Sequence, residues 1–488
     1  MSNIQSDSKV EILIKKATDA AAVFSQLTQE HTDRIVKAVY QAGLKNRVKL
    51  AKMAVEETKI GVWQDKVIKN VVGSLLVYED IKDMKTAGII SDDRELGIME
   101  IAQPIGPILA IIPVTNPTST VIFKILIALK TRNPVIISPH SKAIKSSVET
   151  ARICYEAALS EDAPENCIQW ARDGSESAEE AANHRAHSKA LMSHPKLALI
   201  LATGGSGIVK AAYASGTPAY GVGAGNVPVF IDKSAKIPFA VENILISKTF
   251  DNGTICASEQ AVVVEKSIAK EVIEEFKKQK GYFLTEDEVV KVEKFAYDKE
   301  RDSMSEFVVG QSVKRIAELA GINIPEGTRL LIAHQKKVGK DAPLSSEILC
   351  PIIAFYTADN FDTALSICID LNFHGGMGHS ASLYANDKQV IERFAMEMNA
   401  GRIVLNSPSS QGGVGGIYNK LHTSLTLGCG TTGKNITTDN VTALHLMNIQ
   451  RVASRRENIR LFKLEKDLFF NEAISVSEFE NKYNENYL

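Results

Sequence analysis

The segment from Ile108 to Pro113, ILAIIP, decides the fold class of this chain. Five consecutive apolar residues that end at a proline predict a short β-strand buried on both faces. Segments of strand and helix character alternate after it; the strand-like ones are 135–138, 198–202 and 227–231, and the helix-like ones are 143–158, 207–215 and 235–248. This alternation predicts an α/β fold in which helices cover a mostly parallel sheet.

A second α/β series follows the first. Its predicted strands are 261–264, 351–356, 382–384 and 402–405, and its predicted helices are 268–279, 361–371 and 388–398. We place the boundary between the two series near Phe250. Helical periodicity fills residues 9–85, ahead of the first series. Glycine, serine and threonine predict a loop over 406–434, and a charged tail begins at Arg451.

Composition excludes several classes of protein. The 488 residues carry 56 Lys and Arg against 58 Asp and Glu, so the net charge of −2 gives no bulk attraction for a nucleic acid. Hydrophobic residues make up 44% of the chain, which is typical of a large folded core. The longest apolar stretch, 105–114, is shorter than the roughly 20 residues that span a bilayer. With six sparse cysteines and no apolar signal core, we expect a cytoplasmic protein without disulfides.

The stretch from Asp251 to Gln260, DNGTICASEQ, is the most informative for chemistry. Its Asn-Gly pair predicts a tight turn that presents Cys256 between a helix and a strand. Backbone N–H groups at such a junction would favour the thiolate, which is the nucleophilic form, and would stabilise an oxyanion after attack on a carbonyl. The alternative is a small buried cysteine with a packing role.

Three glycine-rich segments accompany this turn. Ala202 to Gly207 follows a strand and opens a helix, where backbone N–H groups can face a pyrophosphate, although the G-x-G-x-x-G spacing is absent. Gly221 to Asn226 has three alternating glycines that let a backbone approach a ligand closely. Each of these two could equally be an ordinary loop. Phe373 to Ser380 carries two histidines; a histidine near a thiolate can move protons, but exposed loop histidines are commoner.

A metal site is the weakest of the chemical interpretations. His184, His187 and His194 lie close together in the sequence. No cysteine or acid beside them completes a known ligand spacing. We therefore predict that the chain has no metal site.

These motifs together resemble the aldehyde dehydrogenase superfamily, and more narrowly its CoA-acylating branch, which includes one half of the bifunctional aldehyde–alcohol dehydrogenases. The resemblance covers about residues 10 to 470. The motifs that carry it are FDNGTICASEQ with Cys256, TNPTST at 115–120, ATGGSG, GVGAGN, LAKMAVEET, QDKVIKN, SPHSKA, GGMGHS, SPSSQGG and SLTLGCG. Several long motifs in the right order make the resemblance specific.

The resemblance implies a fold and a division of the chain. It implies an aldehyde dehydrogenase-like α/β fold with a Rossmann-like cofactor domain, an α/β catalytic domain and a small oligomerisation element. The cofactor domain would occupy 1–249, with an oligomerisation strand near 97–102, and the catalytic domain with its cysteine nucleophile would occupy 250–405. A return segment with the rest of the oligomerisation element would follow over 406–450, and a linker-like tail over 451–488. Relatives pair through these elements, so we expect a homodimer or a larger homo-oligomer.

The resemblance also implies roles for individual residues. Cys256 matches the nucleophile that attacks the aldehyde and then carries the acyl group as a thioester. Asn116 matches the side chain that shares the oxyanion hole with the Cys256 backbone N–H, and His379 matches the histidine near the thiol. The positions that match contacts to NAD or NADP are Ile111, Ile112, Pro113, Val114, Thr115, Asn116, Ser138, Pro139, His140, Gly204, Gly205, Gly223, Glu347 and Leu427.

A departure from the hydrolytic branch decides the acyl acceptor. Hydrolytic members carry a Glu in the segment aligned with Gly221 to Asn226, where it activates water, but this segment contains no acid. Without that base, water competes poorly with a thiol. We therefore expect coenzyme A as the co-substrate. The chain also stops at Leu488, so we expect no fused alcohol dehydrogenase and no iron.

The aldehyde itself is less defined. The expected function is NAD(P)-dependent interconversion of a short-chain aldehyde plus CoA with acyl-CoA, with an acetaldehyde-like substrate favoured. Lys420 and His422 lie in a loop near the family's substrate pocket and could select an anionic aldehyde such as sulfoacetaldehyde or succinate semialdehyde, or could simply face solvent. A hydrolytic aldehyde dehydrogenase and a non-catalytic structural homologue are two further hypotheses for this chain.

Overall fold

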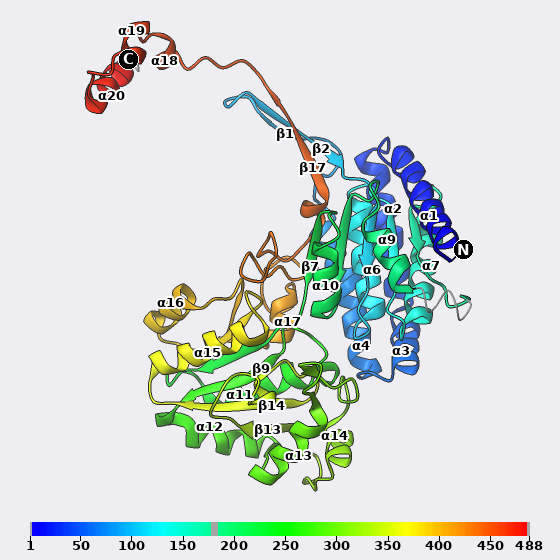
Figure 1. The fold of residues 1–488 in the computed structure, drawn as a ribbon, viewed down its shortest axis with the longest axis vertical. Coiled ribbons are helices and arrows are strands. Elements are labelled where there is room, and N and C mark those ends of the chain that lie inside the picture. The colour runs from blue at the N-terminus through cyan, green and yellow to red at the C-terminus, as the bar shows by residue number, and fades with distance from the viewer. Residues whose placement is uncertain (1, 177–183, 486–488) are drawn as a thin grey trace.

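The computed structural model describes residues 2–176 and 184–485, with the side chains of 2–7 and 184 left aside. The chain forms two α/β units and a long arm that projects away from them (Figure 1). The helices predicted over residues 9–85 are confirmed. They are α1 (Ser2–Phe24), α2 (Gln29–Lys45), α3 (Arg47–Thr58), α4 (Trp63–Val71), the π-helical turn η1 (Val72–Leu76) and α5 (Val77–Ile81).

The first unit is built on a parallel sheet of five strands in the order β5-β4-β3-β6-β7. The strands are β3 (Ile108–Ile111), β4 (Val135–Ser138), β5 (Ile168–Trp170), β6 (Leu199–Thr203) and β7 (Ala219–Val222). Its helices are α6 (Pro117–Lys130), α7 (Ile144–Leu159), α9 (His184–Met192) and α10 (Ser206–Tyr213). All four residues of β3 are buried, so the strand predicted from ILAIIP is confirmed.

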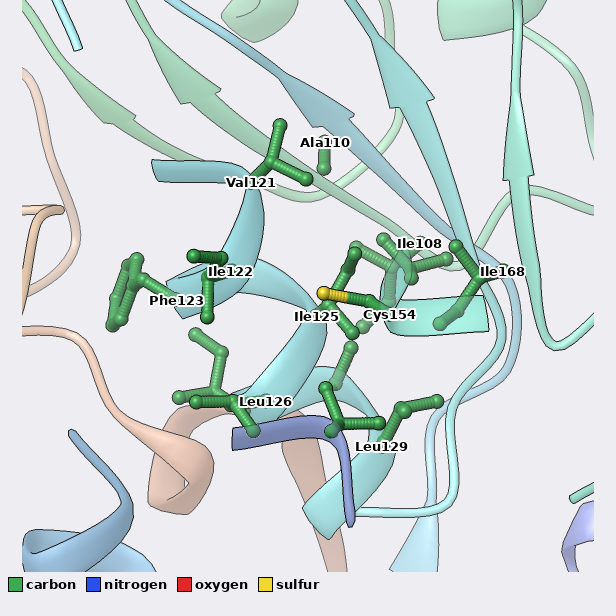
Figure 2. Packing of buried hydrophobic residues seen from close by; sticks show 14 of the residues in the cluster. Ile108, Ala110, Val121, Ile122, Phe123, Ile125, Leu126, Leu129, Cys154 and Ile168 are labelled. Atoms are coloured by element: carbon green, nitrogen blue, oxygen red, sulfur yellow. The ribbon is translucent and has the colours of Figure 1, made fainter. Parts of the chain in front are cut away.

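Helix α6 forms the centre of the core in this unit. All of its residues are buried. Val121, Ile122 and Ile125 pack among residues of the sheet, such as Ile108, and of α7, such as Cys154 (Figure 2). A helix that is buried on every side is enclosed by other elements, and α6 therefore fixes the position of the loop that precedes it.

The second unit is built on a parallel sheet of seven strands in the order β10-β13-β14-β9-β8-β15-β16. The strands are β8 (Val227–Ile231), β9 (Glu259–Glu265), β10 (Gly281–Phe283), β13 (Leu330–His334), β14 (Ile352–Ala358), β15 (Ala381–Tyr384) and β16 (Ile403–Leu405). Its main helices are α11 (Ile237–Thr249), α12 (Lys266–Lys278), α13 (Glu286–Ala296), α14 (Val313–Ala320), α15 (Phe361–Gly375) and α16 (Lys388–Glu397).

The structure corrects two details of the sequence prediction. We placed 227–249 in the first unit, but β8 pairs with β9 and β15, and α11 packs in the core of the second sheet. The change from one sheet to the other therefore falls between Val222 and Val227, ahead of Phe250. Within the predicted loop 406–434, residues Ser409–Val414 form the short helix α17.

The arm is a three-stranded antiparallel sheet in the order β1-β2-β17. It joins β1 (Gly88–Asp93) and β2 (Ile98–Pro104) to β17 (Met447–Ala453), which comes from the other end of the chain. The tail beyond it contains α18 (Ile459–Phe462), α19 (Lys466–Phe470) and α20 (Val476–Glu485), which lie far from both units (Figure 1). Among the helices of residues 2–176 and 184–485, none has the length and apolar character to cross a membrane.

Candidate functional site

A cavity of about 630 Å³ is lined by residues of both units. Its floor includes Ile111 at the end of β3 and Thr203 at the end of β6. These strands are neighbours although β4 and β5 lie between them in the sequence, so the strand order reverses here. Open α/β sheets bind ligands in the crevice outside such a reversal. The second unit adds Cys256 and Glu347 to the wall of this cavity.

The structure gathers nearly all of the residues that we matched to cofactor contacts. Those that line the cavity are Ile111, Ile112, Pro113, Val114, Thr115, Asn116, Ser138, Pro139, His140, Gly204, Gly205, Gly223 and Glu347. Leu427 is the exception: it is buried in a small apolar cluster with Val222, Ile255 and Ala257, behind the lining. Leu427 therefore packs against residues of the cavity wall and is not itself part of the described lining.

One side of the cavity is suited to binding phosphate. Helix α10 begins at Ser206, and its N-terminus, preceded by Gly204 and Gly205, faces the cavity. Backbone N–H groups there attract phosphate oxygens. A Cβ atom added at Gly205 or Gly223 would meet nothing within 4 Å, so the backbone leaves open space for a ligand at both positions.

The turn ahead of Cys256 has an unusual backbone. Asp251, Asn252 and Gly253 in η2 (Phe250–Gly253) have φ values of 50°, 52° and 76°. Left-handed residues in succession are rare, and such strain persists only where surrounding contacts hold it. Here the Asp251 carboxylate accepts hydrogen bonds from the Val62 backbone N–H at 2.7 Å and from the Thr254 hydroxyl at 2.7 Å. The predicted tight turn is present, and its conformation is fixed by helix α4 and its surroundings.

His379 lies beside the thiol. Its Nε2 atom is 3.2 Å from Cys256 Sγ, and its Nδ1 atom is 3.0 Å from the Ser380 hydroxyl. The buried Arg402 guanidinium donates to the His379 carbonyl at 2.8 Å and to the Ser380 hydroxyl at 3.4 Å. The predicted pair of cysteine and histidine is therefore brought together, and Arg402, which we did not predict, holds the histidine in place.

The electrostatics of this pair correct one expectation. Burial raises the pKa of Cys256 to about 12, and the Glu347 carboxylate adds to the rise, while the Cys256 backbone N–H lowers it. Burial, with the nearby Arg402 charge, lowers the pKa of His379 to about 3. We expected backbone donors to favour the thiolate. The Cys256 backbone N–H acts in that direction, but burial has the larger effect on the pKa of the thiol.

Asn116 lies at the start of α6, opposite the thiol loop. Its Nδ2 atom donates to the Thr254 carbonyl at 3.2 Å, and its Oδ1 atom accepts a hydrogen bond from Lys69 Nζ at 2.6 Å. Lys69 and Lys66 in α4 both bind Asp251 Oδ2, at 2.5 Å and 2.8 Å. We predicted no role for the motif QDKVIKN. Its two lysines are three positions apart, and this spacing, which places both on one face of a helix, is the feature that could have indicated a shared partner.

Glu347 connects the cavity to the glycine-rich segment before β8. Its Oε1 atom accepts a hydrogen bond from the Gly225 backbone N–H at 2.9 Å. Burial raises the pKa of Glu347 to about 7. Among the described residues, Glu347 is the one carboxylate-bearing residue that lines the cavity. The segment that we singled out for lacking an acid contributes Val222, Gly223 and Ala224 to the lining.

The two candidate residues for an anionic substrate lie elsewhere. His422 is exposed, and its Nδ1 atom is 2.9 Å from Asp80 Oδ1. Lys420 is also exposed. Neither belongs to the described lining of the cavity that holds Cys256. The structure therefore does not bring them to the thiol, because the loop turns toward α5 and pairs its imidazole there.

Comparison with known proteins gives consistent matches. The model of the aldehyde dehydrogenase family matches residues 3–418. Aldehyde-alcohol dehydrogenase 2 of Entamoeba histolytica is 44% identical over 473 residues, which are 95% of this chain and 53% of that protein. The succinate-semialdehyde dehydrogenase (acetylating) of Clostridium kluyveri is 36% identical over 91% of this chain and 95% of its own length.

A solved structure agrees with the fold described above. The acetylating aldehyde dehydrogenase of Geobacillus thermoglucosidasius superposes with a TM-score of 0.88, at 46% identity, over 94% of this chain and 99% of that chain. The chain spans about half the length of the aldehyde–alcohol dehydrogenases that it matches. With a family match over most of its residues and a cysteine-lined cavity between two parallel sheets, the chain belongs to the aldehyde dehydrogenase family.

Proposed function

We propose that this protein is a CoA-acylating aldehyde dehydrogenase, which interconverts a short-chain aldehyde plus coenzyme A with acyl-CoA. The observation that carries the proposal is the surroundings of Cys256. The thiol lines a cavity of about 630 Å³, has His379 Nε2 at 3.2 Å, and faces a glycine-rich segment without a carboxylate that could activate water. Matched proteins described as acetylating support the same reaction.

The first half of the reaction makes a thioester on Cys256. With a proton on Nδ1 directed at Ser380, His379 Nε2 accepts the proton of the thiol as the sulfur bonds to the carbonyl carbon of the aldehyde, and the imidazole then releases that proton to solvent. The Asn116 Nδ2 group and the Cys256 backbone N–H stabilise the oxyanion that forms. A bound nicotinamide supplies the hydride acceptor. As the C–H electron pair leaves the substrate carbon, the oxyanion becomes a carbonyl again and the acyl group remains on Cys256.

The second half transfers the acyl group to coenzyme A. The CoA thiol loses its proton to a base, for which neutral His379 is placed, and attacks the acyl carbon. The bond to Cys256 Sγ breaks, and the cysteine leaves as a thiolate that takes the same proton from His379 Nε2. Water is a poorer nucleophile than a thiolate and needs a general base to compete. Glu347, the one carboxylate of the described lining, has its Oε1 atom engaged by the Gly225 N–H.

The proposal extends to the substrate, the cofactor and the assembly. An acetaldehyde-like substrate is favoured because Lys420 and His422, the two cations proposed for an anionic aldehyde, lie outside the described lining of the cavity. We propose NAD or NADP as the cofactor, supported by the glycine-rich turn at Gly204 and Gly205 before α10, whose backbone N–H groups attract phosphate. We also propose a homodimer or larger homo-oligomer, because the edges of β1 and β17 in the projecting arm can pair with another chain.

An aldehyde panel tests this proposal. Acetaldehyde, propionaldehyde, succinate semialdehyde and sulfoacetaldehyde would each be assayed with NAD and with NADP, with and without CoA, and the products separated by chromatography. We expect acyl-CoA from the neutral short-chain aldehydes, and steady turnover only with CoA. Free carboxylic acid formed at full rate without CoA would contradict the proposal and establish a hydrolytic enzyme.

A further inference from the structure

Lys69 contacts both parts of the oxyanion site. Its Nζ atom is 2.6 Å from Asn116 Oδ1, which belongs to the first unit. The same atom is 3.0 Å from the Thr254 hydroxyl and 3.3 Å from the Thr254 carbonyl, two residues before Cys256 in the second unit. One ammonium group therefore joins the asparagine side chain to the loop that presents the thiol.

The contact fixes which way the Asn116 amide faces. An ammonium group has three donors and no acceptor, so the atom that meets it must be Oδ1, and Nδ2 must face away from it. Asparagine at a helix N-cap ordinarily caps the helix with its side chain. Asn116 is the N-cap of α6, yet its side chain makes no capping hydrogen bond, and Pro117 occupies the first turn. The Asn116 side chain therefore contacts Lys69 and the loop before Cys256 instead of capping the helix.

Lys69 lies in a charged group that is buried and nearly balanced. Its side chain is 5% exposed and that of Asp251 is fully buried. Lys66 binds the same carboxylate, and Asp65 accepts a hydrogen bond from the Asp251 backbone N–H at 2.7 Å. The ring of Phe250 lies under the Lys69 ammonium at 5.6 Å. Burial lowers the pKa of Lys69 to about 8 and the Lys66 charge acts in the same direction, while Asp251 and Asp65 oppose the fall, so Lys69 is mainly a cation at neutral pH.

We propose that Lys69 is a positioning residue for the oxyanion site, which holds Asn116 Oδ1 so that Nδ2 points at the loop of Cys256. This role rests on the proposed function, because it concerns the oxyanion of the aldehyde reaction. Without Lys69, the amide is oriented only through Nδ2, which donates to the Thr254 carbonyl at 3.2 Å and to the Thr115 hydroxyl at 3.1 Å, and an amide that turns over presents its oxygen to the developing negative charge. Such a turn converts a stabilising donor into a repulsive acceptor.

Lys66 provides a matched control within the same helix. It is also buried, and it binds Asp251 Oδ2 at 2.8 Å and the Thr115 carbonyl at 2.7 Å, but no contact joins it to the Asn116 side chain. Lys66→Met therefore removes the same charge from the same carboxylate and leaves the Asn116 contact intact. Any loss that comes from the charge or from the stability of the loop appears in both lysine variants.

The test is a double-mutant cycle on the first turnover. The burst of NADH, or NADPH, with excess aldehyde is measured by stopped flow for the wild type, Lys69→Met, Lys66→Met, Asn116→Ala and both double variants. The burst precedes acyl transfer, so it tests Lys69 whether the acceptor is CoA or water, and the CoA-dependence of the product tests the proposed function separately. Alkylation of Cys256 by iodoacetamide, which forms no oxyanion, reports on the integrity of the thiol loop.

We expect Lys69→Met to lower the burst rate by roughly 10²-fold, near the loss of one oxyanion donor. In the Asn116→Ala background the same change should lower it less than about threefold, because there is no amide left to position. Lys66→Met should lower the burst rate by the same factor in the wild-type and Asn116→Ala backgrounds. The rate of Cys256 alkylation should change less than about threefold in Lys69→Met. The proposal would be overturned if Lys69→Met lowered the burst rate by the same factor with and without Asn116→Ala, or if it did not lower the burst rate at all.

Lys69→Gln keeps the proposal testable if the methionine variant fails to fold. Glutamine is close to methionine in size, and its amide retains a donor for Asn116 Oδ1. We expect its burst rate to exceed that of Lys69→Met by about tenfold, and its loss to shrink in the Asn116→Ala background. If Lys69→Gln loses the same factor with and without Asn116, the assignment is wrong.

Discussion

His379 Nε2 lies 3.2 Å from Cys256 Sγ, although the two residues are 123 positions apart in the sequence. The thiol comes from the loop before β9, and the imidazole from the loop before β15. Both strands flank β8 in the second sheet and run parallel to it, so the loops that precede them lie at the same end of the strands. The parallel order of this sheet is therefore what assembles the reactive pair.

Cys256→Ala should abolish NAD(P)H formation and leave cofactor binding unchanged. The change removes the only thiol of the described cavity lining and leaves the rest of the cavity intact. Steady-state absorbance at 340 nm measures turnover, and fluorescence titration measures the Kd of the cofactor. Persistent NAD(P)H formation in this variant would remove Cys256 from the role of nucleophile.

Asn116→Ala should lower turnover by roughly 10²–10³-fold, the usual effect of losing one oxyanion donor. The loss should appear in kcat more than in KM, because the oxyanion exists only after the thiolate has attacked. An unchanged kcat, or a loss confined to KM, would mean that the Asn116 amide does not stabilise the oxyanion.

Glu347→Gln should make the thiol more reactive, but only above neutral pH. The pKa of Glu347 is raised to about 7, so its carboxylate is ionised above that pH and neutral below it. When ionised, it opposes the Cys256 thiolate and raises the pKa of the thiol. Glutamine keeps an acceptor for the Gly225 N–H and carries no charge, so the thiolate becomes easier to form at pH 8 and above.

The rate of Cys256 alkylation by iodoacetamide, followed by mass spectrometry from pH 6 to 10, measures this effect. In the wild type the rate should rise without a plateau, because the pKa of the thiol is raised to about 12. The Glu347→Gln curve should match it near pH 6 and lie above it from pH 8. Coincident curves at high pH would show that Glu347 does not act on the thiol.

Gly225→Ala should disturb the thiol loop far more than Gly223→Ala. A Cβ atom at Gly225 would lie 2.1 Å from the Cys256 carbonyl oxygen, whereas one at Gly223 would meet nothing within 4 Å. The first change therefore forces the backbone of the nucleophile loop to move, at a cost of about 1–3 kcal/mol. Thermal unfolding should show a lower midpoint for Gly225→Ala only, and an equal drop in both variants would contradict this account.

Much of the fold could be predicted from local patterns. The run ILAIIP and the strands after it are buried on both faces, so their apolar residues alone identify them. Which sheet a strand joins is a different matter. The segment 227–231 follows the first series without interruption, and only its pairing with β9 and β15, farther along the chain, assigns it to the second sheet.

The candidate site was predictable where a motif names a residue type and not where a long-range contact gives it a role. Cys256 and His379 come from recognisable loops. The local sequence instead suggests that Lys66 and Lys69 are surface charges of a helix. They are buried because each forms an ion pair with Asp251, which is 185 and 182 positions away in the sequence. Likewise, the sequence does not show how deeply Cys256 is buried, and so does not show that burial raises the pKa of its thiol by more than the backbone N–H lowers it.

The central claim is that Cys256 carries an acyl group that a thiol removes and water does not. Mass spectrometry of the peptide with Cys256, after one turnover with NAD(P) and acetaldehyde, measures this directly. Without CoA, the peptide should gain one acetyl group that persists through many turnover times, and added CoA should remove it and yield acetyl-CoA. If the peptide stays unmodified, or if it loses the acetyl group to water as fast as to CoA, the account is contradicted.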